Sequence, residues 1–258
     1  MIEGMARCRL LALLLLCAVG GWVSADSPTT TVPVRGKNQT LHLYGPRAGP
    51  PVVVSSGDGG WIPLGPVVAE FLGSQGYSVV GVDAKAYLSS FTSGTKTLAP
   101  SDVPGDYTVF VEAARQGRSQ PVILVGVSEG AGLSVLAASN GELQPLLGGV
   151  LALGLPDRNE LGWRFRDSII YVTKGVPNEP LFQAADYVPQ LGSLPLAAIH
   201  STRDEFVPLA ETRRLLALPG GPKRLWTIEA ADHRFSDKPQ ELQQRLLEAL
   251  AWIKAGGR

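Results

Sequence analysis

The sequence predicts an α/β fold: a doubly wound, mostly parallel sheet with helices on both faces. Short Val/Ile/Leu-rich runs alternate with helix-type segments along most of the chain. The apolar runs show little polar alternation, which is typical of parallel strands buried on both faces. With 258 residues, 45% of them apolar, the chain is long enough for one such domain. We find no internal repeat, and the expected single domain covers residues 40–258.

The first 25 residues are expected to be a secretory signal peptide. Arg7 and Arg9 precede a short apolar stretch at residues 10–19, and a small-x-small ending leads to cleavage after Ala25. Such a signal would deliver the protein to the periplasm. An uncleaved anchor is an alternative, although the apolar stretch is short for a membrane span. A lipoprotein cut before Cys17 is another, although the preceding leucine is bulky for that cleavage.

Cysteine and charge content narrow the function classes. Both cysteines, Cys8 and Cys17, lie in the signal segment, so the mature chain would have no disulfide, thiol nucleophile or cysteine–metal site. A cysteine-free exported chain suits a periplasm-like compartment. The 23 basic and 23 acidic side chains balance, which gives no electrostatic reason to expect nucleic acid as a partner.

The elements follow in order along the chain. Residues 26–39 are Thr/Pro-rich and are expected to form a flexible lead-in. Residues 157–193 fit no clean pattern and suggest a small lid-like insertion. Strands are expected at residues 40–46, 51–57, 77–84, 121–128, 148–156, 194–202 and 223–231. Helices are expected at residues 63–75, 103–117, 129–139, 209–217 and 239–254, the last with apolar residues at helical spacing.

The clearest motif is G-V-S-E-G at residues 126–130, which matches G-x-S-x-G. It lies between an expected buried strand and an expected helix. In this context the motif indicates that Ser128 is a nucleophile on a strained turn, where glycines let backbone segments approach closely. The alternative is an ordinary tight turn between a strand and a helix.

A serine nucleophile needs a base and an acid that orients the base. The sequence has three histidines. His42 and His200 lie inside expected strands, where packing or edge roles are expected, whereas His233 lies in a polar loop after the last strand. His233 is therefore the candidate base, with a solvated loop residue as the alternative. Asp204, in the loop after the preceding strand, is the candidate acid; Glu205 is the alternative, and Asp204 could instead cap a turn or helix.

The chain order Ser128, Asp204, His233 is the order found in α/β-hydrolases. Because three independent placements agree in order, they predict a catalytic triad more strongly than the serine motif does alone.

An oxyanion site needs backbone N–H groups facing the nucleophile. The amide of Glu129 is one candidate, and the loop S-G-D-G-G-W at residues 56–61 supplies the other. By position the second donor is the Asp58 amide, or else that of Gly59. Gly59 and Trp61 are also candidate substrate-binding residues. The alternative is that the loop is a glycine-rich turn that caps the next helix.

Three stretches together resemble a known family. They are S-G-D-G-G-W at residues 56–61, V-V-G-V-D-A-K-A-Y-L at 79–88 and L-V-G-V-S-E-G-A-G-L-S-V-L-A-A-S-N-G-E-L at 124–143. They resemble the bacterial virulence protein family typified by VirJ and AcvB, within the α/β-hydrolase superfamily. The resemblance implies an exported serine hydrolase. For AcvB-type members it implies cleavage of the aminoacyl ester of lysyl-phosphatidylglycerol, and for others a binding role in type IV secretion.

The sequence departs from this family pattern on both sides of the nucleophile. Val127 and Glu129 stand where an aromatic residue and a Phe are expected. The departure leaves the nucleophile in place but leaves the substrate open. Carboxylates of Asp58 and Glu129 near the serine would attract a cationic lysyl group. The alternative is that Asp58 is a turn residue and Glu129 faces solvent.

The sequence therefore predicts hydrolysis of a small-molecule or lipid carboxylic ester through an acyl-enzyme, with peripheral contact to membrane lipid. No metal or organic cofactor is expected, since no ligand cluster is evident. The alternative function is a non-catalytic periplasmic binding factor associated with type IV secretion; a peptidase or carbohydrate esterase also stays open. Trp163, Phe165 and Tyr171 are candidates for an acyl pocket or for core packing. Asp83, at the end of a strand, is expected to be structural.

Overall fold

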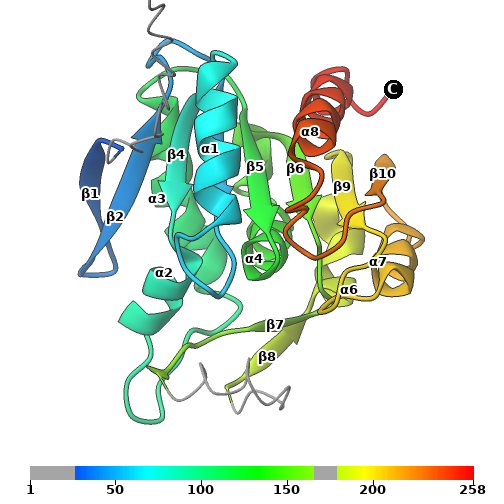
Figure 1. The fold of residues 1–258 in the computed structure, drawn as a ribbon. Helices are drawn as coiled ribbons and strands as arrows, with labels where there is room; N and C mark the ends of the chain where they lie inside the picture. Colours follow the sequence, from blue (N-terminus) through cyan, green and yellow to red (C-terminus); the bar gives the residue numbers. More distant parts are fainter. Residues whose placement is uncertain (1–26, 166–178) are drawn as a thin grey trace, which may run out of the picture.

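A computed structural model describes residues 27–165 and 179–258 and places one sheet at the centre of the protein (Figure 1). The eight strands run in the order β1-β2-β4-β3-β5-β6-β9-β10. β2 is antiparallel to both β1 and β4, and every other neighbouring pair is parallel. The predicted fold class, an α/β fold with a mostly parallel sheet, is confirmed. The expected signal peptide at residues 1–25 lies outside the described residues.

The strands of the central sheet are short, and the inner ones are buried along their whole length, as their apolar composition predicts. β3, β4, β5 and β9 have no exposed residue. The strands are β1 (Thr29–Val34), β2 (Lys37–Tyr44), β3 (Pro51–Ser55), β4 (Ser78–Val82), β5 (Val122–Val127), β6 (Leu147–Leu153), β9 (Leu196–Ser201) and β10 (Lys223–Ile228).

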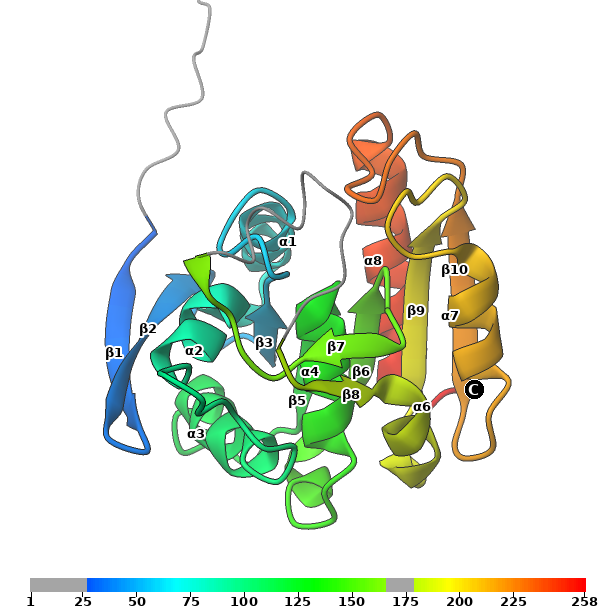
Figure 2. The same cartoon turned by 90° about the horizontal axis from the view of Figure 1, so that it is seen from below.

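Helices cover both faces of the sheet. On one face α1 and α8 pack on the strands, and on the other face lie α3, α4 and α7 (Figures 1 and 2). The helices are α1 (Leu64–Ser74), α2 (Ala84–Ser90), α3 (Val103–Arg115), α4 (Glu129–Ala138), α6 (Ala184–Tyr187), α7 (Leu209–Leu216) and α8 (Pro239–Lys254), with 3-10 turns at Gln144–Leu146 and Val188–Leu191. None of the helices in the described part of the chain is long and apolar enough to cross a bilayer.

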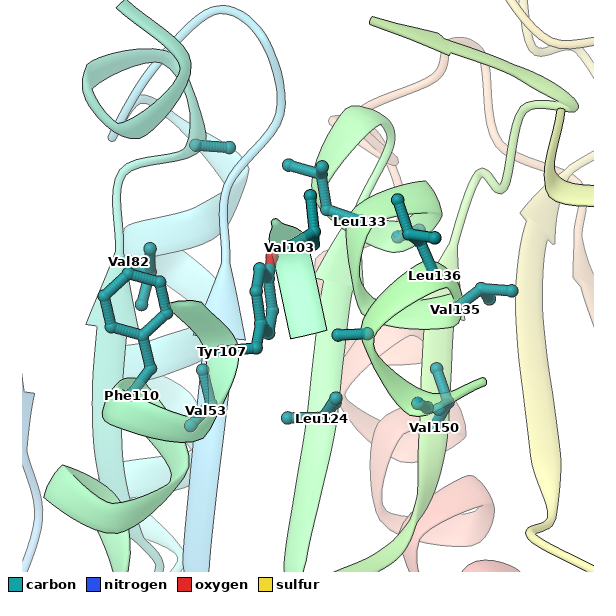
Figure 3. Packing of buried hydrophobic residues seen from close by; sticks show 14 of the residues in the cluster. Val53, Val82, Val103, Tyr107, Phe110, Leu124, Leu133, Val135, Leu136 and Val150 are labelled. Carbon is teal, nitrogen blue, oxygen red and sulfur yellow. The ribbon is translucent and has the colours of Figure 1, made fainter. Parts of the chain in front are cut away.

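Two apolar clusters hold the layers together. Figure 3 shows the cluster between the sheet and α3/α4, where Tyr107 and Phe110 pack against valines of the strands. Their rings meet edge to face, 5.5 Å apart. The other cluster joins the opposite face to α1 and α8. Because both faces of the sheet are packed, the positions of the strands are fixed, and so are the positions of the loops that follow them.

The expectation of a flexible lead-in at residues 26–39 is wrong for most of that segment. Residues 29–34 form β1, which pairs with β2 from Thr29 opposite His42 to Val34 opposite Lys37. β1 is an edge strand with only Val34 buried. An edge strand tolerates Pro33 because one side of it needs no hydrogen bond partner, and the Thr residues favour extended backbone.

The insertion at residues 157–193 is partly described. β7 (Arg158–Glu160) and β8 (Leu181–Gln183) form an antiparallel ribbon that lies beside α4, as the view from below shows (Figure 2). The ribbon is followed by α6. Residues 166–178, where the candidate Tyr171 falls, lie outside the described residues.

Candidate active site

The candidate site lies at the carboxyl ends of the parallel strands, the edge where α/β sheets commonly bind ligands. The loop after β3 carries Asp58, β5 leads directly into Ser128, β9 into Asp204, and β10 into the loop with His233. The sheet order places β3, β5, β6 and β9 next to one another. Residues far apart in the sequence therefore meet at one edge.

Ser128 occupies a strained turn. Its backbone has φ 50° and ψ −118°, a conformation that residues with a Cβ rarely adopt. Its amide donates to the Leu153 carbonyl at 2.8 Å, and its own carbonyl accepts from Ala131 in the first turn of α4. These hydrogen bonds hold the turn between strand and helix, so the side chain is aimed by the backbone.

The flanking glycines are required by close packing. A Cβ on Gly126 would lie 2.3 Å from the Gly130 carbonyl oxygen, and a Cβ on Gly130 would lie 2.3 Å from the Ser56 carbonyl oxygen. Real Cβ atoms do not approach backbone so closely. The G-x-S-x-G spacing therefore lets α4 start directly against the ends of β3 and β5.

The candidate base and acid form a short hydrogen bond. His233 Nδ1 lies 2.6 Å from Asp204 Oδ2, and the two side chains are only 9% and 1% exposed, so solvent does not compete for this contact. Burial would raise the pKa of Asp204, but hydrogen bonding and charge attraction from His233, with amides of Val207 and Phe206, hold it below its usual value. An ionised acid that accepts from Nδ1–H leaves Nε2 of the ring as the proton acceptor.

Space for the imidazole is kept open by a glycine at the end of β6. Gly154 has φ 60°, and a Cβ there would lie 2.5 Å from His233 Cε1 and 3.4 Å from Asp204 Oδ2. Its amide donates to the Ile199 carbonyl at 3.0 Å, which ties β6 to β9. The exit of β6 therefore forms one wall around the imidazole.

The loop that carries Asp204 is held on several sides. Asp204 Oδ1 accepts from the amides of Phe206 (3.0 Å) and Val207 (2.8 Å), so this residue also caps a turn. Glu205, the alternative acid, accepts instead from the backbone amide of His233 at 2.8 Å. The structure therefore pairs the ring with Asp204 and uses Glu205 to hold the backbone.

Of the other two histidines, neither reaches the serine through a hydrogen bond. His200 is fully buried, with Nε2 bonded to the Val207 carbonyl (3.0 Å) and Nδ1 to Thr212 Oγ1 (2.9 Å). Its Nε2 is also 3.6 Å from Asp204 Oδ2, a supporting contact that the sequence did not indicate. His42 stacks on Trp61, with ring centroids 4.7 Å apart.

A pocket of about 410 Å³ joins these groups. This volume is in the range of small-molecule sites. Ser128 and His233 both line it, as do Asp58 and Gly59. Its full lining in the described residues is Gly57, Asp58, Gly59, Ile62, Pro63, Leu64, Gly65, Val127, Ser128, Phe206, His233 and Arg234. No group of three or more His, Cys, Asp or Glu side chains in the described ranges is placed to hold a metal ion.

The candidate nucleophile and the candidate base are not joined by a hydrogen bond. Within the described residues, Ser128 Oγ has no hydrogen bond partner within 3.5 Å, although it shares the pocket wall with His233. In ligand-free enzymes this contact is often long and shortens when substrate binds. In the candidate triad, the Asp204–His233 pair is already joined by a hydrogen bond, whereas Ser128 and His233 are not.

The candidate oxyanion donors lie beside the serine. A Cβ on Gly57 would be 3.4 Å from Ser128 Cβ, so the loop after β3 passes directly over the nucleophile. The Glu129 amide, at the N-terminus of α4, has no acceptor within the described residues. Burial raises the pKa of the Asp58 carboxyl, and the nearby amides of Gly59 and Asp58 offset part of that rise.

The Glu129 side chain is buried rather than exposed to solvent. It is 5% exposed, and its Oε1 accepts from the Glu160 amide at 2.6 Å. Burial, with the nearby carboxyls of Glu160 and Asp58, raises the pKa of Glu129 well above its usual value. A protonated Glu129 would not attract a cation, so only Asp58 of the two expected carboxylates contributes a carboxyl to the pocket wall.

Several sequence candidates lie elsewhere. Trp61, expected to bind substrate, does not line the pocket; its indole fills the space above Gly81 and donates to Tyr44 Oη at 3.3 Å. Trp163 packs against Lys85, 4.2 Å from its ring, and Phe165 is 83% exposed, so neither forms an acyl pocket in the described residues. The contacts of Trp61 and Trp163 are packing contacts within the protein.

The expectation for Asp83 is confirmed. This residue is the N-cap of α2, and its Oδ1 accepts from the Ala86 amide at 2.9 Å. It is structural.

Sequence reasoning missed much of the pocket wall. Ile62, Phe206 and Arg234 all line the pocket. Phe206 meets the His233 ring edge to face, with centroids 5.6 Å apart. Only their position could have indicated them, since each lies within four residues of a candidate site residue and none belongs to a recognisable motif.

Comparisons with known proteins agree with this geometry. Residues 51–146 match the family model described as bacterial virulence protein (VirJ). The resemblance to the VirJ family is confirmed over this stretch. It covers β3 to the turn after α4, and therefore includes the Ser128 elbow and the glycine loop. No curated protein matches the chain.

Solved structures show the same fold at low identity. Est1E from Butyrivibrio proteoclasticus superposes with a TM-score of 0.65 at 15% identity, covering 89% of this chain and 100% of that one. A membrane phospholipase A described as a bacterial virulence factor gives 0.64 at 14%, covering 89% and 87%. The esterase domain of a Rhodothermus marinus protein gives 0.61 at 17%, covering 88% and 98%. The protein therefore has the α/β-hydrolase fold.

Proposed function

We propose that this protein is a serine hydrolase that cleaves carboxylic esters through an acyl-enzyme and acts in the periplasm. The observation that carries the proposal is the 2.6 Å contact between Asp204 and His233 in the pocket that Ser128 lines. The fold and the VirJ match support it, since the structural neighbours include esterases.

Each group has a chemical task in the proposed reaction. Ser128 Oγ attacks the ester carbonyl carbon while His233 Nε2 takes its proton, and Asp204 stabilises the imidazolium. The tetrahedral intermediate then expels the alcohol, which receives the proton from His233. Water attacks the acyl-enzyme by the same steps in reverse and releases the acid and Ser128.

The negative oxygen of the intermediate would be bound at the N-terminus of α4. The Glu129 amide points from the helix end beside Ser128, and the loop amide at Asp58 or Gly59 supplies the second donor. Losing one such donor costs about 3 kcal/mol of transition-state stabilisation. The helix N-terminus adds a favourable partial positive charge.

A fluorophosphonate probe tests the proposal directly. We expect covalent labelling at Ser128, loss of labelling in His233→Ala, and about 10³- to 10⁴-fold slower ester hydrolysis in Asp204→Asn, since the wrong ring tautomer would be held. His42→Gln is the matched control because His42 packs on Trp61 outside the pocket. A folded wild-type protein that is not labelled would contradict the proposal and favour the binding-factor alternative.

For the substrate we propose an aminoacyl ester of a phospholipid, such as lysyl-phosphatidylglycerol. The VirJ resemblance and the Asp58 carboxyl in the pocket wall support this, whereas buried Glu129 does not contribute. Asp58→Asn should lower the preference for lysyl over neutral aminoacyl esters. Asp186→Asn, an exposed residue outside the pocket lining, is the control. An unchanged preference in Asp58→Asn would contradict the cationic substrate.

A further inference from the structure

A second cavity, of about 360 Å³, lies beside the catalytic pocket between α1 and the loop and helix of α8. Both helices pack on the same face of the sheet (Figure 1). We call this cavity the α1–α8 groove. Its lining is Pro63, Leu64, Val67, Val68, Phe71, Asp232, Arg234, Phe235, Ser236, Pro239, Leu242, Gln243 and Leu246.

The walls of the groove are mainly apolar. Val67, Val68 and Phe71 form the α1 side, and Leu242 and Leu246 form the α8 side. The acidic member of the lining is already engaged by its own loop. Asp232 Oδ1 accepts from the amides of Arg234 and Ser236, each at 3.0 Å, and its Oδ2 accepts from Ser236 Oγ. The groove therefore offers apolar surface and few unsatisfied polar groups.

The groove adjoins the catalytic pocket, because the two cavities share wall residues. Pro63, Leu64 and Arg234 line both cavities. Pro63 and Leu64 form the start of α1, directly after the glycine loop that passes over Ser128. The groove is therefore next to the place where a molecule bound at Ser128 would lie.

Exposed apolar side chains gather at the same place. Ile62 (71% exposed) and Phe206 (52%) line the catalytic pocket, and Val67 (47%) lines the groove. Only Phe165 and Leu247 are further exposed large apolar residues in the described part of the chain. Exposed apolar surface beside a cavity is one feature of grooves that bind apolar ligands.

We infer that the α1–α8 groove binds a long hydrocarbon chain of the ester substrate while the ester lies at Ser128. The inference rests on the proposed function and specifies its substrate class. Each methylene that leaves water for an apolar wall adds about fourfold to binding. The chain can belong to the acyl or to the alcohol part, and the shared chemistry is an unbranched alkyl chain of roughly eight or more carbons.

Chain-length profiles test the inference. We would measure kcat/KM for p-nitrophenyl esters of C2 to C12 acids, and for C2 to C12 alkyl esters of a short acid. The first series places the chain on the acyl side and the second on the alcohol side. In wild type, kcat/KM should rise with length in at least one series.

Two variants fill the groove from partly exposed positions. In Val67→Trp and Gln243→Trp, the ratio of long-chain to short-chain kcat/KM should fall about tenfold or more. The matched controls are Glu70→Trp on α1 and Gln244→Trp on α8, which are exposed and outside the groove lining; they should keep the wild-type ratio. If either Val67→Trp or Gln243→Trp does not fold, the chain-length ratio of the other variant tests the inference.

The outcomes separate this inference from the proposed function. Hydrolysis of short esters with no effect of either filling variant on the ratio overturns the groove and leaves the hydrolase intact. If no ester is cleaved, binding of dansyl-undecanoate is measured instead. Weakening of at least tenfold in Val67→Trp, but not in Glu70→Trp, supports the groove; equal binding by wild type and both variants overturns it.

Discussion

Ser128, the candidate nucleophile, has an unfavourable backbone conformation. At φ 50° and ψ −118° a Cβ is crowded, and such conformations cost of order 1–3 kcal/mol. The hydrogen bonds from Ser128 to Leu153 and from Ala131 to Ser128 hold this conformation in place. The turn thus lowers the stability of the fold but fixes the direction of the Ser128 hydroxyl.

Replacing Ser128 should reveal this strain. We expect the free energy of unfolding of Ser128→Gly to be about 1 kcal/mol higher than that of Ser128→Ala. Glycine adopts this backbone conformation without a crowded Cβ, and this gain exceeds the larger conformational entropy that glycine loses on folding. Urea denaturation of the two variants measures the difference. Equal stabilities would mean that the turn carries no strain.

At the residue scale, motif and loop position predicted Ser128, Asp204 and His233 as the groups that meet at the sheet edge. For the Glu129 side chain, neither a carboxylate at the pocket wall nor a solvent-exposed group matches the structure, whereas the expected role of its amide stays a prediction. The burial of this side chain depends on the Glu160 amide, 31 positions away, and no local pattern encodes that contact. The place of Trp61 outside the pocket lining has a similar cause, since its contacts His42 and Gly81 come from β2 and β4.

The junction of β3, β5 and α4 depends on how closely backbone segments can approach. Gly130 lies over the Ser55 and Ser56 carbonyls, so α4 begins where a side chain would have no room. The connection from β5 to α4 is too short to let α4 move away from the strand ends.

We expect Gly130→Ala to destabilise the protein by about 3 kcal/mol, since backbone must move to admit the methyl group. Gly105→Ala is the control. Gly105 is exposed within α3, and a Cβ there meets nothing within 4 Å, so alanine should stabilise the helix by up to about 1 kcal/mol. Chemical denaturation measures both; a Gly130→Ala loss under 1 kcal/mol would contradict the packing argument.

Elements with strong apolar patterns were the ones that the sequence predicted well. The five expected helices match α1, α3, α4, α7 and α8 to within two residues at each end. β1, β7 and β8 were missed because an exposed edge and three-residue strands carry no periodic signal. α2 was missed because its seven residues are too few to show an amphipathic stripe.

Stability of the whole molecule should depend on the proton held by Glu129. Burial, with the Glu160 and Asp58 carboxyls, raises its pKa well above 4.5 in the folded state. Above pH 4.5 the unfolded chain loses this proton while the folded protein keeps it. The free energy of unfolding therefore falls as pH rises, until the folded pKa is passed.

Glu129→Gln removes this dependence because glutamine cannot ionise, yet its amide oxygen can still accept from the Glu160 amide. Relative to wild type, the variant should gain up to about 1.4 kcal/mol of stability per pH unit above 4.5. Urea denaturation from pH 4.5 to 8 checks this, with Glu142→Gln, an exposed carboxyl, as control. A stability difference that is constant with pH would mean that Glu129 is ionised in the folded protein.

The fold class followed from the alternation of elements, but the order of strands in the sheet did not. β2 and β3 are consecutive in sequence yet separated by β4 in the sheet. The hydrophobic pattern of a strand indicates that the strand is buried but not which strands lie beside it. The sequence could therefore place the pocket at one edge of the sheet but could not predict which loops form it.

Gly154 extends what counts as the active site. It belongs to no motif, yet a methyl group there would collide with the imidazole of His233, the candidate base. Anyone moving the Ser128, Asp204 and His233 arrangement onto another scaffold would need to keep a glycine behind the ring as well. A random mutagenesis screen for loss of the proposed hydrolase activity should return position 154 together with these three residues.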